Sequence, residues 1–349
     1  MDNKLYILLV ASLLIFSACT ERHIGLDPAP GSSNSYIFFE PKVYVPVDSK
    51  ASLIEDSLPT EEGSAFGVMG YAGTNTASIF ADGGIARVYW DGTVFKYDNL
   101  AIWHGNETEH TFYAYYPYSL TSVNQNNGNP YILYTQPTSE SAMQEVLTAS
   151  ASTKKTSNLT VPLEFHHRLW ALDVVVKNSQ TTGVDADNNV TSTPTITVTG
   201  IDVTVKNFPT SASIYLNGTD LVLTRDSNGN LLKNNPNVYS LPIADEDAMN
   251  IIATGAQNTY GSLLFLPVPA NIFTYQITVK YLDSTGKSAE FTSTEKTSSI
   301  AFEAGKKYTL TVNKTNDQFV MGEYYDPDGN SSNFQPSDWY NVSFEHTFN

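Results

Sequence analysis

The sequence has 349 residues, of which 41% are hydrophobic and 16% are charged, with a formal net charge of −17 at pH 7. This hydrophobic content can bury a substantial core, which argues against a disordered chain. The strong negative charge repels phosphate backbones, so no nucleic acid is expected as a partner. Abundant Tyr, Phe, Thr, Ser and Asn favour strands and turns over helices.

The N-terminal segment is organised like a lipoprotein signal peptide. After Lys4 come twelve uncharged residues, 5–16, which are too few to span a membrane but suit a signal peptide. Phe16-Ser17-Ala18-Cys19 resembles a bacterial lipobox, with Phe16 where Leu is commonest, and Cys19 is the sole cysteine. We expect a lipoprotein signal peptide at 1–18 and lipidation of Cys19, which would anchor the chain to a membrane. An ordinary secretory signal with an incidental cysteine is the alternative.

Residues 19–35 are polar and contain Pro, Gly and Ser, which predicts a flexible tether. Beyond it, short segments alternate apolar and polar residues and are separated by turn sequences, a pattern typical of β-sandwiches. The expected strands are 42–48, 85–97, 111–118, 131–134, 195–206, 213–216, 221–223, 263–268, 275–282 and 308–312. Asp91-Gly92 and Asn217-Gly218 predict hairpin turns.

The chain is long enough for two domains. A polar gap at 152–158 suggests a boundary near residue 160, so we place an N-terminal β-sandwich at 36–160 and a C-terminal one at 161–349. The clearest helical candidate is short, residues 141–149. The prediction is therefore an all-β fold.

The stretch EFHHRLWALDVVV, residues 164–176, joins two apolar runs. Alternate residues of a strand point to opposite faces, so His166 and His167 should point apart and not share a metal. The apolar phase then changes between Ala171 and Leu172, which predicts a bulge or a strand that passes from one sheet to the next. We expect His167 on the apolar face, in a structural role.

Other chemical candidates lack the spacing of known motifs. His104 and His110, with Glu107 and Glu109, lie in a loop and not at helical i, i+4 spacing. The stretches 185–189 and 326–330 hold Asp and Asn as calcium loops do, but the required Gly and Glu positions do not match. A nucleophile motif and a phosphate-binding loop are missing from the sequence. We predict no catalytic residue, no metal site, no cofactor and no enzymatic activity.

A family resemblance rests on four features that occur in order. They are the lipobox, FYAYYP at 112–117, VPLEFHHRL at 161–169 and FEAGKKYTL at 302–310. Together they resemble the fimbrillin-like proteins of Bacteroidetes, lipoprotein precursors of type V pili. The resemblance implies two tandem transthyretin-like β-sandwiches and export to the outer membrane surface, with a lipid such as palmitate at the N-terminus.

The resemblance also implies a structural or accessory (tip or anchor) pilus subunit that supports adhesion. Such pilins bind other pilin subunits by strand exchange, after a protease cuts behind an arginine and an N-terminal strand leaves. Arg22 and Arg87 are the candidate cleavage sites. Residues 339–349 form the candidate donor strand, with Tyr340, Val342, Phe344 and Phe348 on one face.

Two alternatives stay open at this point. The terminal strand could instead complete its own sheet. The protein could also be a monomeric surface lipoprotein that binds glycans, because its sequence is rich in aromatic residues. A host or bacterial surface glycan or protein is the further partner that adhesion implies.

Overall fold

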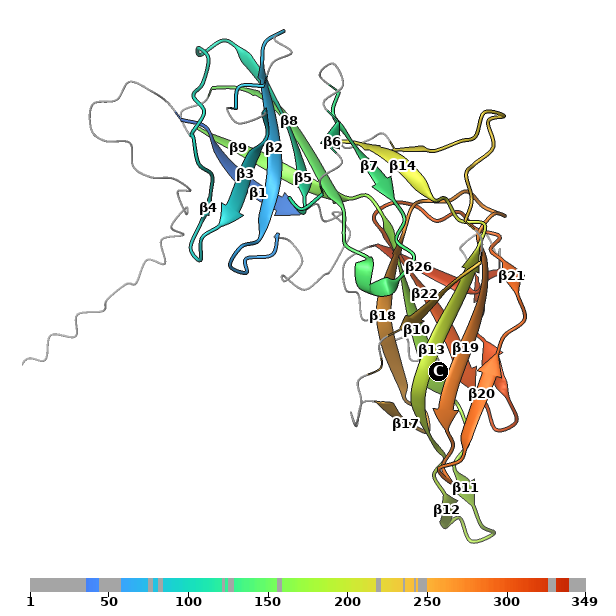
Figure 1. Ribbon diagram of the computed structural model, residues 1–349. Helices are drawn as coiled ribbons and strands as arrows, with labels where there is room; N and C mark the ends of the chain where they lie inside the picture. The colour runs from blue at the N-terminus through green and yellow to red at the C-terminus, as the bar shows by residue number, and fades with distance from the viewer. Residues whose placement is uncertain are drawn as a thin grey trace, which may run out of the picture.

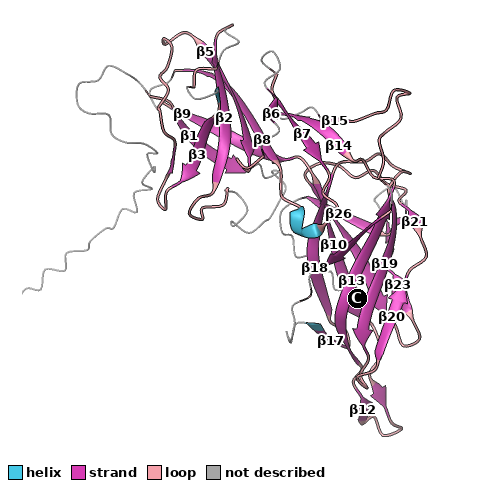
Figure 2. Ribbon diagram, viewed as in Figure 1, coloured by secondary structure: helices cyan, strands magenta, loops and turns pink. Residues whose placement is uncertain are grey.

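The computed structural model describes residues 36–43, 58–74, 78–80, 84–120, 123–124, 129–155, 159–217, 221–234, 236–241, 243, 250–325 and 331–338. Their regular secondary structure is almost entirely β-strand, as predicted, and the strands form several sheets that pack in sandwich-like layers (Figures 1 and 2). Within this part of the chain, no helix is long and apolar enough to cross a membrane.

A seven-stranded sheet contains most of the N-terminal strands. In spatial order these are β1 (Phe38–Val43), β9 (Thr160–His167), β8 (Leu147–Lys154), β5 (Glu109–Tyr116), β2 (Ala65–Ala72), β3 (Ala86–Trp90) and β4 (Phe95–Lys96). The sheet curls so that its first and last strands, β1 and β4, approach each other. One face encloses a core that includes Phe66, Phe112 and Phe165.

The opposite face of this sheet carries a small four-stranded sheet. Its strands are β15 (Leu221–Leu223), β14 (Ser211–Tyr215), β7 (Tyr131–Thr135) and β6 (Val123–Asn124). Ile132 and Ile214 of the small sheet pack with Met69 and Tyr115 of the large one. Strand β2 is therefore buried on both faces, and Gly67 faces Tyr115, whose ring would lie 2.3 Å from an added Cβ.

Two further sheets pack face to face around the largest core. One contains β18 (Gln257–Phe265), β10 (Trp170–Asn178), β22 (Lys306–Lys314), β23 (Phe319–Met321) and β26 (Phe334–Asp338). The other contains β16 (Asn237–Leu241), β13 (Thr195–Lys206), β19 (Thr274–Leu282), β20 (Ser288–Thr292), β17 (Ile251–Ala253) and β21 (Lys296–Thr297). Trp170 lies at the centre of this core, where its ring stacks on Phe302 at 4.2 Å.

Two short hairpins and one helical turn complete the described structure. They are β11 (Gly183–Val184) with β12 (Val190–Ser192), β24 (Tyr324–Tyr325) with β25 (Ser331–Ser332), and the 3-10 turn η3 (Glu140–Ala142). The expected helix at 141–149 is wrong, because only this turn forms and β8 begins at Leu147. Val146, one of the apolar residues that suggested a helix, is instead fully buried at the junction between the seven-stranded and the five-stranded sheets. There its carbonyl accepts a hydrogen bond from the Arg168 amide.

The stretch 164–176 behaves as its phase change predicts. Strand β9 ends at His167 in the seven-stranded sheet, and β10 begins at Trp170 in the five-stranded sheet, so the chain passes between sheets at Arg168 and Leu169. The register of β10 against β18 shifts between Leu172 and Val174, which adds a bulge. The division of the chain at residue 160 stays a prediction, but β9 pairs with β1 and β8 and so lies with the N-terminal strands.

Candidate functional site

Strand β1 is an edge strand whose pairing partner is distant in the sequence. Strand β1 lies at the edge of the seven-stranded sheet and pairs in parallel with β9, from Phe38 opposite Thr160 to Val43 opposite Phe165. A strand in a hairpin cannot leave without opening its turn, but the parallel partner of β1 lies more than a hundred residues away in the sequence. Strand β1 is therefore tied to its neighbour only by ladder hydrogen bonds and side-chain packing.

The start of β1 is also held on its other side. The Ile37 amide donates a hydrogen bond to the Ala101 carbonyl at 3.0 Å, and the Tyr97 hydroxyl donates to the Ile37 carbonyl at 2.8 Å. Burial raises the pKa of Tyr97, so its hydroxyl stays protonated and remains a donor. These contacts make the seat of β1 a groove with a wall on each side.

The buried face of β1 fills the groove with large apolar groups. Ile37 and Phe39 are almost completely buried, and the Phe39 ring contacts those of Phe80, Tyr97 and Phe112 at centroid distances of 6.2, 5.7 and 5.5 Å. Burial of each such side chain contributes about 1.5–3 kcal/mol. An incoming strand would have to place alternate apolar side chains at the same positions to replace β1.

An open depression adjoins the N-terminal end of this groove. It is lined by Tyr36, Ile79, Asn99, Leu100, Ala101, Ile102 and His104. The depression lies next to the groove, because Tyr36 directly precedes the buried Ile37 and forms a β-bridge with Ile102.

The C-terminal strand of the described chain lies in the second sandwich, which the five-stranded and six-stranded sheets form around the largest core. Strand β26 pairs antiparallel with β22, from Phe334 opposite Leu310 to Asp338 opposite Lys306, and Phe334 is fully buried among aromatic rings. This part of the C-terminus thus completes its own sheet. The predicted donor residues Tyr340, Val342, Phe344 and Phe348 lie outside the described residues, so their role stays a prediction.

Of the predicted processing residues, the structure describes Arg87 and not Arg22 or the lipidation residue Cys19. Arg87 lies within β3, where it pairs with Gly67 of β2, and its guanidinium lies over the rings of Tyr89 and Tyr118. A cut after Arg87 would divide β3 and separate both β1 and β2 from the rest of the sheet. Processing at either arginine stays a prediction.

His110 holds a loop in place. Its ring is fully buried, its Nε2 accepts a hydrogen bond from the His104 amide at 3.1 Å, and its Nδ1 lies 3.0 Å from the Thr108 carbonyl. Burial lowers the pKa of His110, which favours the neutral ring that this bonding pattern requires. Among the described residues, no group of three His, Cys, Asp or Glu could hold a metal ion.

His166 and His167 have separate carboxylate partners. His166 Nε2 lies 3.5 Å from Glu164, and His167 contacts Glu145, the residue that precedes the buried Val146 at the junction. The His167 side chain is 13% exposed, against 37% for His166. The two rings therefore have different surroundings, as the strand alternation predicted.

The aspartate at the start of the 185–189 stretch closes a hairpin turn. Asp185 Oδ1 accepts hydrogen bonds from the Asp187 and Asn189 amides, both at 2.9 Å. Asp226 binds the amides of Asn228 and Asn230 in the same way. The carboxylates thus serve their own turns. The residues of the other calcium-like stretch, 326–330, lie outside the described residues.

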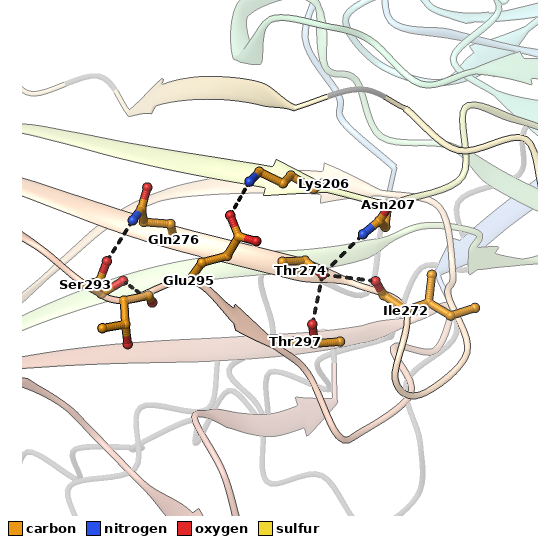
Figure 3. A network of polar contacts seen from close by, with 9 residues as sticks. Lys206, Asn207, Ile272, Thr274, Gln276, Ser293, Glu295 and Thr297 are labelled. Atoms are coloured by element: carbon orange, nitrogen blue, oxygen red, sulfur yellow. Dashed lines mark hydrogen bonds and ion pairs between the residues drawn. The ribbon is translucent and has the colours of Figure 1, made fainter.

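An edge of the second sandwich is interrupted by polar contacts (Figure 3). Between β20 and β21, the Ser293 hydroxyl accepts a hydrogen bond from the Ile277 amide at 3.0 Å. The Gln276 side chain donates to the Ser293 carbonyl at 2.8 Å. Glu295 forms an ion pair with Lys206. A broken, charged edge of this kind resists the addition of another strand.

Sequence patterns missed two features of this site. The expected first strand was 42–48, whereas β1 spans Phe38–Val43 and residues 44–48 lie outside the described part. The second wall of the groove, formed by Tyr97 and Ala101, was also not anticipated. The apolar run Ile37-Phe38-Phe39 before Glu40 was the sequence signal that could have located β1.

Comparison with known proteins identifies relatives for most of the chain. A model of the fimbrillin-like family matches residues 52–324. No curated protein matches the sequence. The fold resembles that of a fimbrial protein from Bacteroides vulgatus, with a TM-score of 0.55, 16% identity, and coverage of 88% of this chain and 100% of that one.

Two candidate cell adhesion proteins have a similar fold. The one from Bacteroides ovatus has a TM-score of 0.53 and 14% identity, covering 89% of this chain and all of the other. The one from Bacteroides uniformis has a TM-score of 0.51 and 18% identity, covering 88% of this chain and all of the other. At these identities the likeness shows a shared fold.

Proposed function

Because this chain belongs to the fimbrillin-like family, we propose that it is a pilus subunit at the cell surface that assembles by strand exchange and supports adhesion. The observation that carries the proposal is the seat of β1. It combines an edge position, a parallel partner distant in sequence and a groove that an alternating apolar strand can fill. The fimbrial and adhesion proteins of the same fold are consistent with this role.

The sequence after Asp338 supports the donor half of the exchange. At least eleven residues follow Asp338, whereas β1 has six, so the tail is long enough to fill the groove and keep a short linker. Its apolar residues recur at every second position from Tyr340 to Phe344, which matches the alternating buried positions of β1. The donor would come from another copy, because strand exchange then links subunits in series.

The N-terminal sequence supports attachment to the outer membrane. Lipidation of Cys19 would anchor the precursor, and cleavage after Arg22 would free the folded chain from its lipid while leaving β1 in place. Release of β1 by strand displacement would then open the groove without any cut at Arg87. A subunit that keeps its lipid would serve as the anchor, and one that loses it would serve in the stalk or at the tip.

A reversible covalent lock on β1 tests the proposal. Phe38 and Thr160 are neighbours on adjacent strands, both half-buried on the outer face, so Phe38→Cys with Thr160→Cys should form a disulfide. Lys177→Cys with Asn313→Cys provides a matched control, because these residues face each other on the parallel strands β10 and β22. The only native cysteine, Cys19, is removed together with the predicted signal peptide in a chain that starts at residue 20.

The readout is the ladder of oligomers that unheated samples form on a denaturing gel. Under oxidising conditions the disulfide that locks β1 should abolish the ladder, and reduction of that disulfide should restore it. The control disulfide should leave the ladder intact in both conditions. Deletion of 339–349 should abolish the ladder in either state. A ladder that persists with β1 locked would contradict exchange at this groove.

A further inference from the structure

The outer face of the four-stranded sheet exposes aliphatic and aromatic side chains among polar ones, and none of the other described strands pairs or packs on it. Its inner face packs on the seven-stranded sheet through buried residues such as Ile132 and Ile214. Strand alternation then directs Tyr131, Leu133 and Val222 outward. The exposed fractions of Leu133, on the inner strand β7, and Val222, on the edge strand β15, are 52% and 55%.

The register places these side chains side by side. Leu133, Ser213 and Val222 face one another in a row across three strands, which sets a hydroxyl between two aliphatic groups. In the adjacent row, Tyr131 is opposite Tyr215, and their ring centroids lie 5.3 Å apart. The Asn124 side chain of β6 donates a hydrogen bond to the Tyr131 hydroxyl at 3.0 Å and so fixes that ring.

The described strand residues that point outward on this face carry no formal charge, although the protein carries −17. The strand residues that point outward are Asn124, Tyr131, Leu133, Thr135, Ser211, Ser213, Tyr215 and Val222. They combine aromatic rings with hydroxyl and amide groups. A neutral sugar presents the matching chemistry, because its C–H faces can pack on the rings while its hydroxyls pair with the polar groups.

The size of the face separates a sugar from a protein partner. Three inter-strand spacings of about 4.8 Å and five residues of about 3.3 Å give a surface of roughly 250 Å². A stable protein–protein interface buries about 800 Å² on each partner. The face alone is thus smaller than a stable protein–protein interface and large enough for a short oligosaccharide.

We infer that the outer face of the sheet β15-β14-β7-β6 binds a neutral glycan, with Tyr131 and Tyr215 as the stacking platform. This inference deepens the adhesive role proposed above and rests on it. The row of Leu133, Ser213 and Val222 extends the platform along a second sugar unit. The small sheet joins β7, from before the junction, to β14, from beyond it, so the ligand would contact both parts of the chain.

The test uses the chain without residues 339–349, which under the proposed function stays monomeric but keeps the whole sheet. Binding is measured on an array of neutral, sialylated and sulfated glycans, followed by titration with the best neutral oligosaccharide. Tyr131→Ala and Tyr215→Ala should each weaken the affinity at least tenfold. Ser213→Glu should do the same by placing a carboxylate in the central row without removing a buried group. Tyr324→Ala, at a half-buried tyrosine of β24, is the matched control and should leave the affinity unchanged.

Several results would overturn the inference. The inference is wrong if the protein binds no neutral glycan on the array, or if it binds only sialylated or sulfated glycans. It is also wrong if Ser213→Glu leaves the affinity for the neutral glycan unchanged. Concentration-dependent dimers in sedimentation that Ser213→Glu abolishes would assign the face to a second copy instead. Loss of the oligomer ladder bears only on strand exchange, because glycan binding is read on the monomer.

Discussion

The packing of Phe39 gives the most direct test of how firmly β1 is seated. Phe39→Ala removes a ring that is 1% exposed and contacts three other aromatic rings. Replacement of a buried Phe by Ala costs about 3–5 kcal/mol, because the lost transfer energy and the remaining cavity add. Phe38→Ala is the matched control, since Phe38 is adjacent in the same strand but only half-buried on the outer face.

Hydrogen exchange followed by mass spectrometry reads the opening of β1 directly. A loss of 3 kcal/mol corresponds to roughly 100-fold faster exchange of the β1 amides that open locally. Phe38→Ala should change this rate by less than about 5-fold. Phe39→Ala should also make the oligomer ladder appear faster, because a donor strand displaces a more weakly held β1 sooner.

Two results would refute this reasoning. Equal effects of Phe39→Ala and Phe38→Ala would mean that ring burial does not hold β1 in place. Faster exchange spread evenly over both sandwiches, without excess at β1, would mean that β1 opens only when the whole chain unfolds.

Three further predictions concern the scaffold. Gly67→Ala should lower the free energy of unfolding by about 1–3 kcal/mol in urea denaturation, because its Cβ would overlap the Tyr115 ring, whereas Gly200→Ala meets only a flexible lysine side chain and should have less effect. Burial lowers the pKa of His110 in the folded state, so the unfolded state binds the proton better below pH 6.5. Acidification from pH 7 to 5 should therefore lower the free energy of unfolding of the native sequence more than it lowers that of the His110→Phe variant. A hydrogen bond from a neighbouring lysine helps lower the pKa of Asp91 to about 2 from 3.8, so its stabilising contribution should be lost between pH 4 and pH 2, and Asp91→Asn should flatten that part of the stability profile.

Local patterns in the sequence were sufficient for the fold class. Alternating residues and turn dipeptides report on one strand and its next neighbour, and they located the hairpin that Asp91 closes between β3 and β4. They also predicted a bulge or a change of sheet within 164–176, but they placed it between Ala171 and Leu172. The passage between sheets lies earlier, at Arg168 and Leu169, and the bulge of β10 lies between Leu172 and Val174.

Long-range pairings could not be read in this way. The parallel partner of β1 lies in β9, and the small sheet joins β7 to β14, strands separated by more than 70 residues. Period-two alternation says which face of a strand is buried and nothing about which strand lies beside it. The groove of β1 and the outer face of the small sheet both depend on such pairings, so neither candidate site was predicted from the sequence.

Two other sheet edges carry features that would hinder the addition of a strand. At the end of β18, the Gln136 side chain donates to the Leu264 carbonyl at 2.8 Å and accepts from the Leu266 amide at 3.0 Å, so backbone groups that another strand would need are already paired. At β20 and β21 the ladder is broken at Ser293 and carries the Lys206–Glu295 ion pair (Figure 3). Assembly in a single register requires one seat that a strand can leave and edges elsewhere that reject strands. Among the described edges, β1 combines a distant parallel partner with an apolar groove beneath it, so an exchanging strand would be directed there.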